Sequence, residues 1–167
     1  MSGSLILGNL FSLAASLCTG MSVIKKSKTD FMYWQVGNTL FAILTNLALF
    51  SFTGMTTNSV SLVRNIFAYK NKLTVRLTFV LLVISIGLGL WLNNRGIIGL
   101  LPVFSSACYT ICVYITKNEQ QLRYALIGDL TLWSIYYLYI QAYPSVITYT
   151  ILNIWTAVQI VKYYKKV

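Results

Sequence analysis

Two ionisable side chains, Arg64 and Asp129, lie deep inside long apolar stretches of the chain. Each is about eight residues from the start of its stretch, roughly 12 Å along the axis if the stretch is an α-helix. A charge at that depth in a bilayer is costly, so we expect both side chains to face the protein interior and to pair directly or through water. The alternative for Arg64 is that its long side chain reaches back to the membrane surface.

Two asparagines, Asn65 and Asn153, are the predicted main contacts for a ligand. A carboxamide both donates and accepts hydrogen bonds, which suits the hydroxyl or amide groups of a neutral polar molecule. They take matching places in an internal repeat described below, so we expect them to hold a ligand from opposite sides. The alternative is that each only bridges neighbouring helices.

Trp133 lies one helical turn from Asp129 and can stack on a sugar ring or a flat heterocycle. Packing in the core is an equally weighted alternative for this indole. Asn38 takes the place in the first repeat that Asp129 takes in the second. These two polar residues and Trp133, with Arg64, complete the predicted substrate-binding set.

The residue types argue against catalysis. The chain has no histidine, only three acidic residues and three cysteines, and all the cysteines lie inside apolar stretches. No metal-ligand spacing, nucleophile motif or phosphate-binding loop can be assembled from what remains. We therefore predict a protein that is not an enzyme, with no metal, no cofactor and no structural disulfide.

The elements that must position these residues are membrane-spanning helices. The 167 residues are 57% apolar and 10% charged, with a mean hydropathy of +0.69. A span takes roughly 20 residues, and backbone groups in lipid must be satisfied within their own helix. The uncharged stretches predict seven spans, near 4–24, 31–53, 56–71, 74–93, 96–115, 121–142 and 145–164.

The net charge of +10 follows the positive-inside rule. With the N-terminus outside, the only basic residues beyond the inner loops and tail are Arg64 and Arg95, so a nucleic-acid partner is not expected. Positive charge follows the first apolar stretch rather than preceding it, which indicates an uncleaved span and not a secretory signal. The inner basic residues are Lys25, Lys26, Lys28, Lys70, Lys72, Arg76, Lys117, Arg123, Lys162, Lys165 and Lys166.

Residues 7–38 and 98–129 align without a gap at an offset of about 91. Such a repeat in a membrane protein predicts two copies of one bundle on either side of a pathway. We place the first repeat at about 4–71, a linker helix at about 74–93 and the second repeat at about 96–164, with both copies running the same way. From about residue 57 the best offset falls to 88, which brings Asn65 onto Asn153. The matched polar and glycine positions are Gly8 and Gly99, Thr19 and Thr110, Lys26 and Lys117, and Gly37 and Gly128.

Two spans have unusual compositions. The third carries seven polar or charged residues within 56–65, so we expect its neighbours or a water-filled cavity to enclose it. The fourth has nothing ionisable after Arg76 and is expected to face lipid. Pro102 is expected to break the hydrogen-bond ladder of the fifth span and to kink it.

The Arg64–Asn65 pair, the LLPV stretch at 100–103, the basic first inner loop and the region of Asn153 resemble the bacterial inner-membrane YgjV family over most of the chain. That family is related in fold to the SWEET and PQ-loop transporters, so the resemblance implies their three-one-three helix arrangement. In SWEET sugar transporters an asparagine in the third helix and one in the seventh contact substrate, and the resemblance implies that role for Asn65 and Asn153. It implies a similar role for Trp133, although Ala42 stands where a second tryptophan would match it.

We therefore predict a single all-α transmembrane domain over 1–167, in the bacterial inner membrane, with the N-terminus outside and the C-terminus cytoplasmic. The expected function is transport of a small polar solute, a sugar among the candidates, by alternating access between two three-helix bundles. It would act as a facilitator or be coupled to an ion. The alternatives are a facilitator of vitamin precursors, and a non-transporting multi-pass protein, either an assembly subunit or a ligand sensor, with a filled core. The lipid bilayer and the solute are the expected partners, and a homo-oligomer is left open.

Overall fold

The computed structural model describes residues 3–164, with side chains up to 163, and within this range it has seven α-helices and no strand. Lys165 and Lys166, which we assigned to the inner tail, lie outside the described residues. A short 3-10 helix, η1 (Gly96–Gly99), precedes the fifth α-helix. The α-helices are α1 (Gly3–Val23), α2 (Lys28–Ala48), α3 (Phe52–Tyr69), α4 (Val75–Trp91), α5 (Leu100–Ile115), α6 (Glu119–Tyr139) and α7 (Tyr143–Tyr164).

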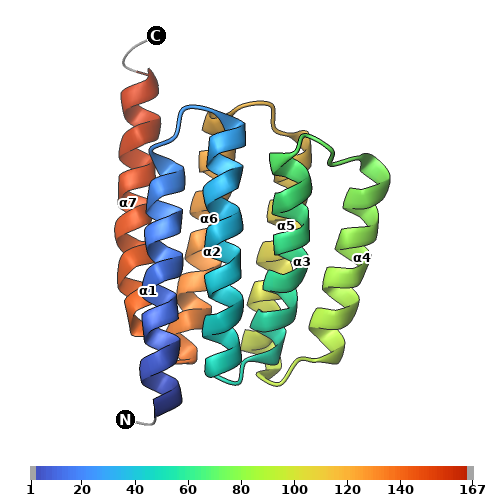
Figure 1. Ribbon diagram of the computed structural model, residues 1–167, viewed down its shortest axis with the longest axis vertical. Coiled ribbons are helices and arrows are strands. Elements are labelled where there is room, and N and C mark those ends of the chain that lie inside the picture. The colour runs from blue at the N-terminus through green and yellow to red at the C-terminus, as the bar shows by residue number, and fades with distance from the viewer. Residues whose placement is uncertain (1–2, 165–167) are drawn as a thin grey trace.

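The helices run alternately up and down, so the start of α1 and the end of α7 lie at opposite ends of the bundle (Figure 1). α2 packs between α1 and α3, and α6 packs between α5 and α7. The two groups meet where α1 contacts α7, α2 contacts α6 and α3 contacts α5. α4 packs on α3 and α5 at the edge of the bundle.

Three helices have the length and apolar composition of a membrane span: α1, α5 with the preceding turn, and α7. α4 is apolar but shorter. α2, α3 and α6 fall outside this set, and many of their polar side chains are buried within the bundle. In α3 these buried residues include Thr53, Thr57, Asn58, Ser61, Arg64 and Asn65, so the prediction that this helix is enclosed is confirmed.

The outer surface is apolar, as a lipid-facing surface must be. α4 exposes Phe79, Val83, Ile86 and Leu90, and buries little more than Leu81 and its small residues. One of these is Gly89, where a Cβ atom would lie 2.5 Å from a methyl carbon of Val103 on α5. The absence of a side chain at this position therefore lets α4 approach α5 closely.

The turns that follow α2 and α6 have the same backbone hydrogen bonds. Ser51 N donates to Asn46 O at 2.8 Å, and Ala142 N donates to Tyr137 O at 2.9 Å. In each turn one non-glycine residue has positive φ, Phe50 at 51° and Gln141 at 63°. The left-handed conformation ends the helix there, which is why the predicted second span 31–53 is in fact two helix segments and a turn.

The starts of α3 and α7 are 91 residues apart (143 minus 52), as are both ends of α2 and α6. The offset of 88 that we expected after residue 57 is therefore wrong for the helix positions. At an offset of 91, Asn65 falls on Thr156 and not on Asn153, and both Asn65 and Thr156 are fully buried.

Pro102 does not break a helix. α5 begins at Leu100, so this proline lies in the first turn, where a backbone N–H has no partner within the helix. The predicted kink was wrong because the residues before Pro102 form η1 instead of continuing the α-helix.

One end of the bundle carries the loops after α1, α3 and α5 and the end of α7, and we call it the basic end (Figure 1). Lys25, Lys26, Lys70, Lys72, Lys117 and Lys162 lie there. Arg95 lies at the opposite end, in the connection between α4 and η1.

Candidate functional site

A small polar cavity, which we call the central cavity, lies where α2, α3, α5, α6 and α7 converge. It has room of about 20 Å³, which is enough for roughly one water molecule. Polar side chains dominate its wall: Gln35, Asn38, Thr39, Asn58, Ser61, Arg64 and Asp129. Tyr109, Trp133, Tyr137 and Tyr149 add aromatic rings, with Leu126 and Leu130.

Arg64 lines this cavity and is 3% exposed. Its Nε donates to Asn65 Oδ1 at 3.0 Å and its Nη1 donates to Thr110 Oγ1 at 3.0 Å. The guanidinium also lies over the Tyr109 ring, 4.8 Å from the ring centroid. α3 and α5 therefore hold the charge in place from two sides, and the side chain does not reach the membrane surface.

Asp129 enters the cavity from α6. Its Oδ1 accepts a hydrogen bond from Ser105 Oγ at 2.6 Å, and Trp133 is a further partner of the carboxylate. Asp129 and Arg64 interact electrostatically across the cavity, but their hydrogen bonds go to other residues. The two charges we expected to pair thus share one small space without direct contact.

Asn38 faces the same space from α2. Its amide donates to Gln35 Oε1 at 3.3 Å, and its Oδ1 accepts from the Tyr149 hydroxyl at 3.4 Å. Gln35 in turn donates to Ser22 Oγ at 2.9 Å, which ties this chain of polar groups to α1.

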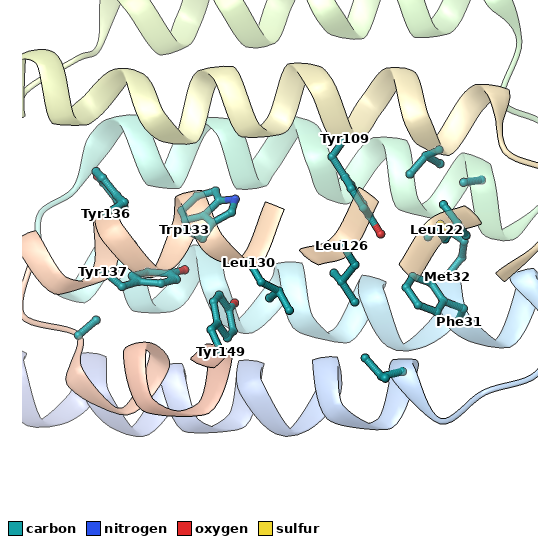
Figure 2. Close-up of a cluster of buried hydrophobic side chains, with 14 of the residues drawn as sticks. Phe31, Met32, Tyr109, Leu122, Leu126, Leu130, Trp133, Tyr136, Tyr137 and Tyr149 are labelled. Carbon is teal, nitrogen blue, oxygen red and sulfur yellow. The ribbon is translucent and has the colours of Figure 1, made fainter. Parts of the chain in front are cut away.

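Aromatic side chains close the cavity toward the end opposite the basic end. The Trp133 ring lies 5.7 Å from Tyr136 and 5.3 Å from Tyr137, measured between centroids. The Tyr136 hydroxyl bonds to Ser51 Oγ, and the Asn46 amide donates to the Tyr137 hydroxyl at 3.5 Å. Figure 2 shows these three rings gathered along one part of α6. We call them the aromatic seal.

Apolar side chains close the cavity toward the basic end. Phe31, Met32 and Leu122 are fully buried there, and Figure 2 shows them grouped beyond Leu126. We call these three residues the apolar seal. Two basic side chains reinforce this end. Lys28 Nζ on α2 donates to Thr116 O at 2.7 Å after α5, and Arg123 Nη2 on α6 donates to Lys25 O at 2.8 Å after α1.

Tyr109 has a buried hydroxyl without a hydrogen-bond partner among the described residues. Its ring reaches from α5 toward α6, so the hydroxyl points into the interior next to Leu126 (Figure 2). A buried hydroxyl without a partner costs free energy, because it loses its bonds to water. The central cavity therefore offers one unused polar group to a water molecule or a ligand.

Asn65 and Asn153, the predicted ligand contacts, do not meet at the cavity. Asn65 is fully buried behind Arg64, where its amide donates to Gln35 O at 3.2 Å. Asn153 donates to Thr131 Oγ1 at 3.2 Å, between α7 and α6. The structure thus brings together Asn38, Arg64, Asp129 and Trp133 from the predicted set and leaves these two asparagines outside the cavity wall.

The prediction from sequence missed several residues that line the cavity. Asn58 and Ser61 precede Arg64 at spacings of six and three, so all three share one face of α3. Gln35 and Thr39 lie beside Asn38 in the same way on α2. This helical spacing of scarce polar residues is a signal that could have identified them. Tyr109 carries no such signal, because a tyrosine in a span is most often an interfacial or packing residue.

Hydrogen-bond donors and acceptors face each other across the cavity, but the described residues include no group of three potential metal ligands of the His, Cys, Asp or Glu types. Cys18, Cys108 and Cys112 are free thiols. The arrangement suits binding of a small molecule that both donates and accepts hydrogen bonds.

A sequence model of the bacterial inner membrane protein family Imp-YgjV matches residues 6–167, nearly the whole chain. The chain belongs to this family and is therefore a bacterial inner membrane protein. No curated protein and no solved structure matches the chain.

Proposed function

From its place in an inner membrane family and its polar central cavity, we propose that this protein moves a small polar solute across the bilayer by alternating access. The observation that carries the proposal is the cavity itself, which polar and aromatic side chains of α2, α3, α5, α6 and α7 line. We propose that the helices form two three-helix halves, α1–α3 and α5–α7, linked by α4, which would be the three-one-three arrangement of SWEET-like transporters. We propose no enzymatic activity.

Three features support the two halves. α2 and α6 span the same lengths at an offset of 91, and the turns after them share their backbone hydrogen bonds. The helix starts also match, since Ser27 caps α2 and Asn118 caps α6, each accepting from the third residue beyond. The order of neighbours is the same in both halves, with α2 and α6 each between the other two helices, and the contact of α1 with α7 corresponds to that of α5 with α3.

The cavity wall contains four pairs of residues at this offset. They are Gln35 and Leu126, Asn38 and Asp129, Thr39 and Leu130, and Asn58 and Tyr149. Equivalent positions from both halves face one space only near the axis that relates the halves. A rocking of one half against the other would open the cavity alternately toward each end of the bundle.

Both ends are closed in this structure, as an occluded state of such a cycle requires. Opening one way separates the aromatic seal from α2 and α3, which breaks the bonds of Tyr136 to Ser51 and of Tyr137 to Asn46. Opening the other way separates the apolar seal and releases Lys28 and Arg123 from the ends of α5 and α1. In the occluded state without solute, room for about one water is expected.

The lining favours an uncharged or zwitterionic polar solute. Arg64 and Asp129 balance each other, and the amides and hydroxyls both donate and accept hydrogen bonds. Trp133 offers an indole ring for a sugar or a flat heterocycle. Movement would follow the solute gradient or be coupled to an ion, with Asp129 as the group that could carry a proton.

We also propose the orientation, with the basic end in the cytoplasm. The positive-inside rule supports this, since the described lysines in loops all lie at that end. The N-terminus is then outside and the C-terminus inside. A fusion reporter active only in the cytoplasm, placed at each terminus in turn, would be active at the C-terminus alone.

One observation favours the alternative, a non-transporting membrane protein such as an assembly subunit or ligand sensor. The cavity holds roughly one water, and groups such as Asn65 are satisfied within the protein. A protein with a filled core of this kind would not have to open its cavity toward either side of the membrane.

The test is the melting temperature of the purified protein against sugars, nucleosides, vitamins and amino acids, followed by uptake of the best stabiliser into proteoliposomes. Wild type is compared with an Asn38→Ala/Asp129→Asn variant and with Asp30→Asn, which removes a charge at the exposed start of α2. A solute that stabilises and enters only with wild type and Asp30→Asn supports transport. Stabilisation without uptake supports a sensor. If none of these solutes stabilises the protein, the central cavity is not a binding site for them.

A further inference from the structure

A second pocket opens at the basic end, between the end of α1, the start of α6 and the end of α7. Its volume is about 320 Å³, against about 20 Å³ for the central cavity. Ile24, Lys26, Arg123 and Lys162 are among the residues that line it. We propose that this pocket binds the phosphate headgroup of an anionic phospholipid, independently of any transported solute.

Three cations face the pocket against one carboxylate, Glu119. Arg123 is 4% exposed, and its bonds to Val23 O and Lys25 O fix its charge in the wall. Lys26 and Lys162 are exposed, and neither donates a hydrogen bond to another described residue, so both ammonium groups are available to an anion. An excess of positive charge at the membrane surface, between helices, attracts lipid phosphate.

One carboxylate, Glu119, lines the pocket beside the three cations. A phosphate oxygen and a carboxylate oxygen are both acceptors and cannot bond to each other, whereas a headgroup hydroxyl can donate to the carboxylate. A headgroup that carries hydroxyls next to its phosphate can therefore use Glu119 while its phosphate meets the cations.

The position of the pocket suits a lipid as occupant. Ile24, which lines the pocket, is 47% exposed, so acyl chains attached to the bound phosphate would meet an apolar side chain at the end of α1. A free phosphate ion would use only the polar part of this site.

The matching place in the other half is built differently. A pocket of about 130 Å³ is lined by Lys28, Ala68 and Asn71, at the positions equivalent to Glu119, Gln159 and Lys162. The ammonium of Lys28 is already bound to the backbone oxygens of Val113 and Thr116. The predicted lipid site therefore belongs to one side of the bundle only.

The experiment is native mass spectrometry of the purified full chain, delipidated and then titrated with phosphatidylglycerol or phosphatidylcholine. The test variant is Lys26→Gln/Lys162→Gln. The control is Lys70→Gln/Lys72→Gln, which removes the same charge at the same end but lies after α3. We expect one phosphatidylglycerol per wild-type chain, roughly tenfold weaker retention in the test variant, as a charged contact pair implies, and no change in the control.

Three results would overturn the proposal. Equal retention of both lipids removes the need for an anionic headgroup. Equal losses in the two variants assign binding to overall charge and not to the pocket. Displacement of the lipid by millimolar inorganic phosphate or glycerol phosphate makes the free anion the occupant. The melting temperature without lipid, equal in wild type and both variants, ensures that all three are folded.

Discussion

Replacing Arg123 with methionine should destabilise the protein far more than the same change at an exposed arginine. Arg123 is 4% exposed and joins α6 to the end of α1, 100 residues away in sequence. Its Nη2 donates to Val23 O at 3.0 Å and to Lys25 O at 2.8 Å, and its Nε shares the first of these acceptors at 3.3 Å. Methionine keeps much of the side-chain volume and loses every donor.

The expected loss follows from the two carbonyl acceptors. A hydrogen bond to a charged group contributes about 1.5–3 kcal/mol, so two such acceptors give a loss of roughly 3–6 kcal/mol in the free energy of unfolding. Because the acceptors lie at the carbonyl end of α1, they also lose a cation that complements the helix dipole. Arg123→Lys keeps the charge and one donor at a time, and should lie between the two.

The assay is reversible unfolding in mixed micelles, with the transition followed as the fraction of denaturing detergent rises. Arg76→Met is the matched control, because Arg76 is exposed on α4 near the same end, and its loss should change stability by no more than about 0.5 kcal/mol. If Arg123→Met lies within about 1 kcal/mol of Arg76→Met, the bonds to α1 do not hold this end of the bundle closed, and the reasoning fails.

Two further substitutions test how closely α4 packs on α5 and whether the Tyr109 hydroxyl in the cavity lacks a partner. Gly89→Ala should cost about 1–3 kcal/mol because its methyl group would overlap Val103, whereas Gly87→Ala, with no atom within 4 Å of the new Cβ, should be neutral or slightly stabilising. Similar unfolding curves for the two glycine variants would contradict this packing. Tyr109→Phe should leave the stability of the protein unchanged or raise it by up to about 1 kcal/mol, since the hydroxyl it removes has no partner among the described residues. The same variant should weaken stabilisation by the solute identified in the melting screen, and full retention of that stabilisation would place the solute away from Tyr109.

The sequence was sufficient to predict the seven helices because charged and polar loop residues separate stretches rich in apolar residues, although only α1, α5 with its preceding turn and α7 have both the length and the apolar composition of a span. It also predicted that α3 is enclosed, since a helix with Thr57, Asn58 and Arg64 in close succession cannot face lipid. The offset of 88 that paired the third span with the seventh was wrong, although the seventh span itself was predicted near its observed place. Apolar residues match at many registers, so a chance pairing of Asn65 with Asn153 outweighed the helix boundary, which depends on a turn at Gln141 that no residue type marks.

The sequence predicted only part of the candidate site, because it indicates how deep a residue lies in a helix but not which way its side chain points. Depth in the membrane is readable from sequence, and it correctly selected Arg64 and Asp129 as residues of the interior. Which face of a helix points to the cavity depends on the packing of five helices. Asn65 is next to Arg64 in sequence, yet one residue of rotation, about 100° on a helix, turns it from the cavity toward the backbone of α2.

In the two halves that we propose, the four pairs of cavity residues at an offset of 91 differ in chemistry. The first half contributes Gln35, Asn38, Thr39 and Asn58. Their counterparts in the second half are Leu126, Asp129, Leu130 and Tyr149, in the same order. A site with true twofold symmetry could not distinguish the two ends of a bound molecule. This one presents amides and a hydroxyl on one side and apolar or aromatic surface with a single carboxylate on the other. In the transport that we propose, a solute would therefore bind in one fixed orientation between the two sides of the cavity.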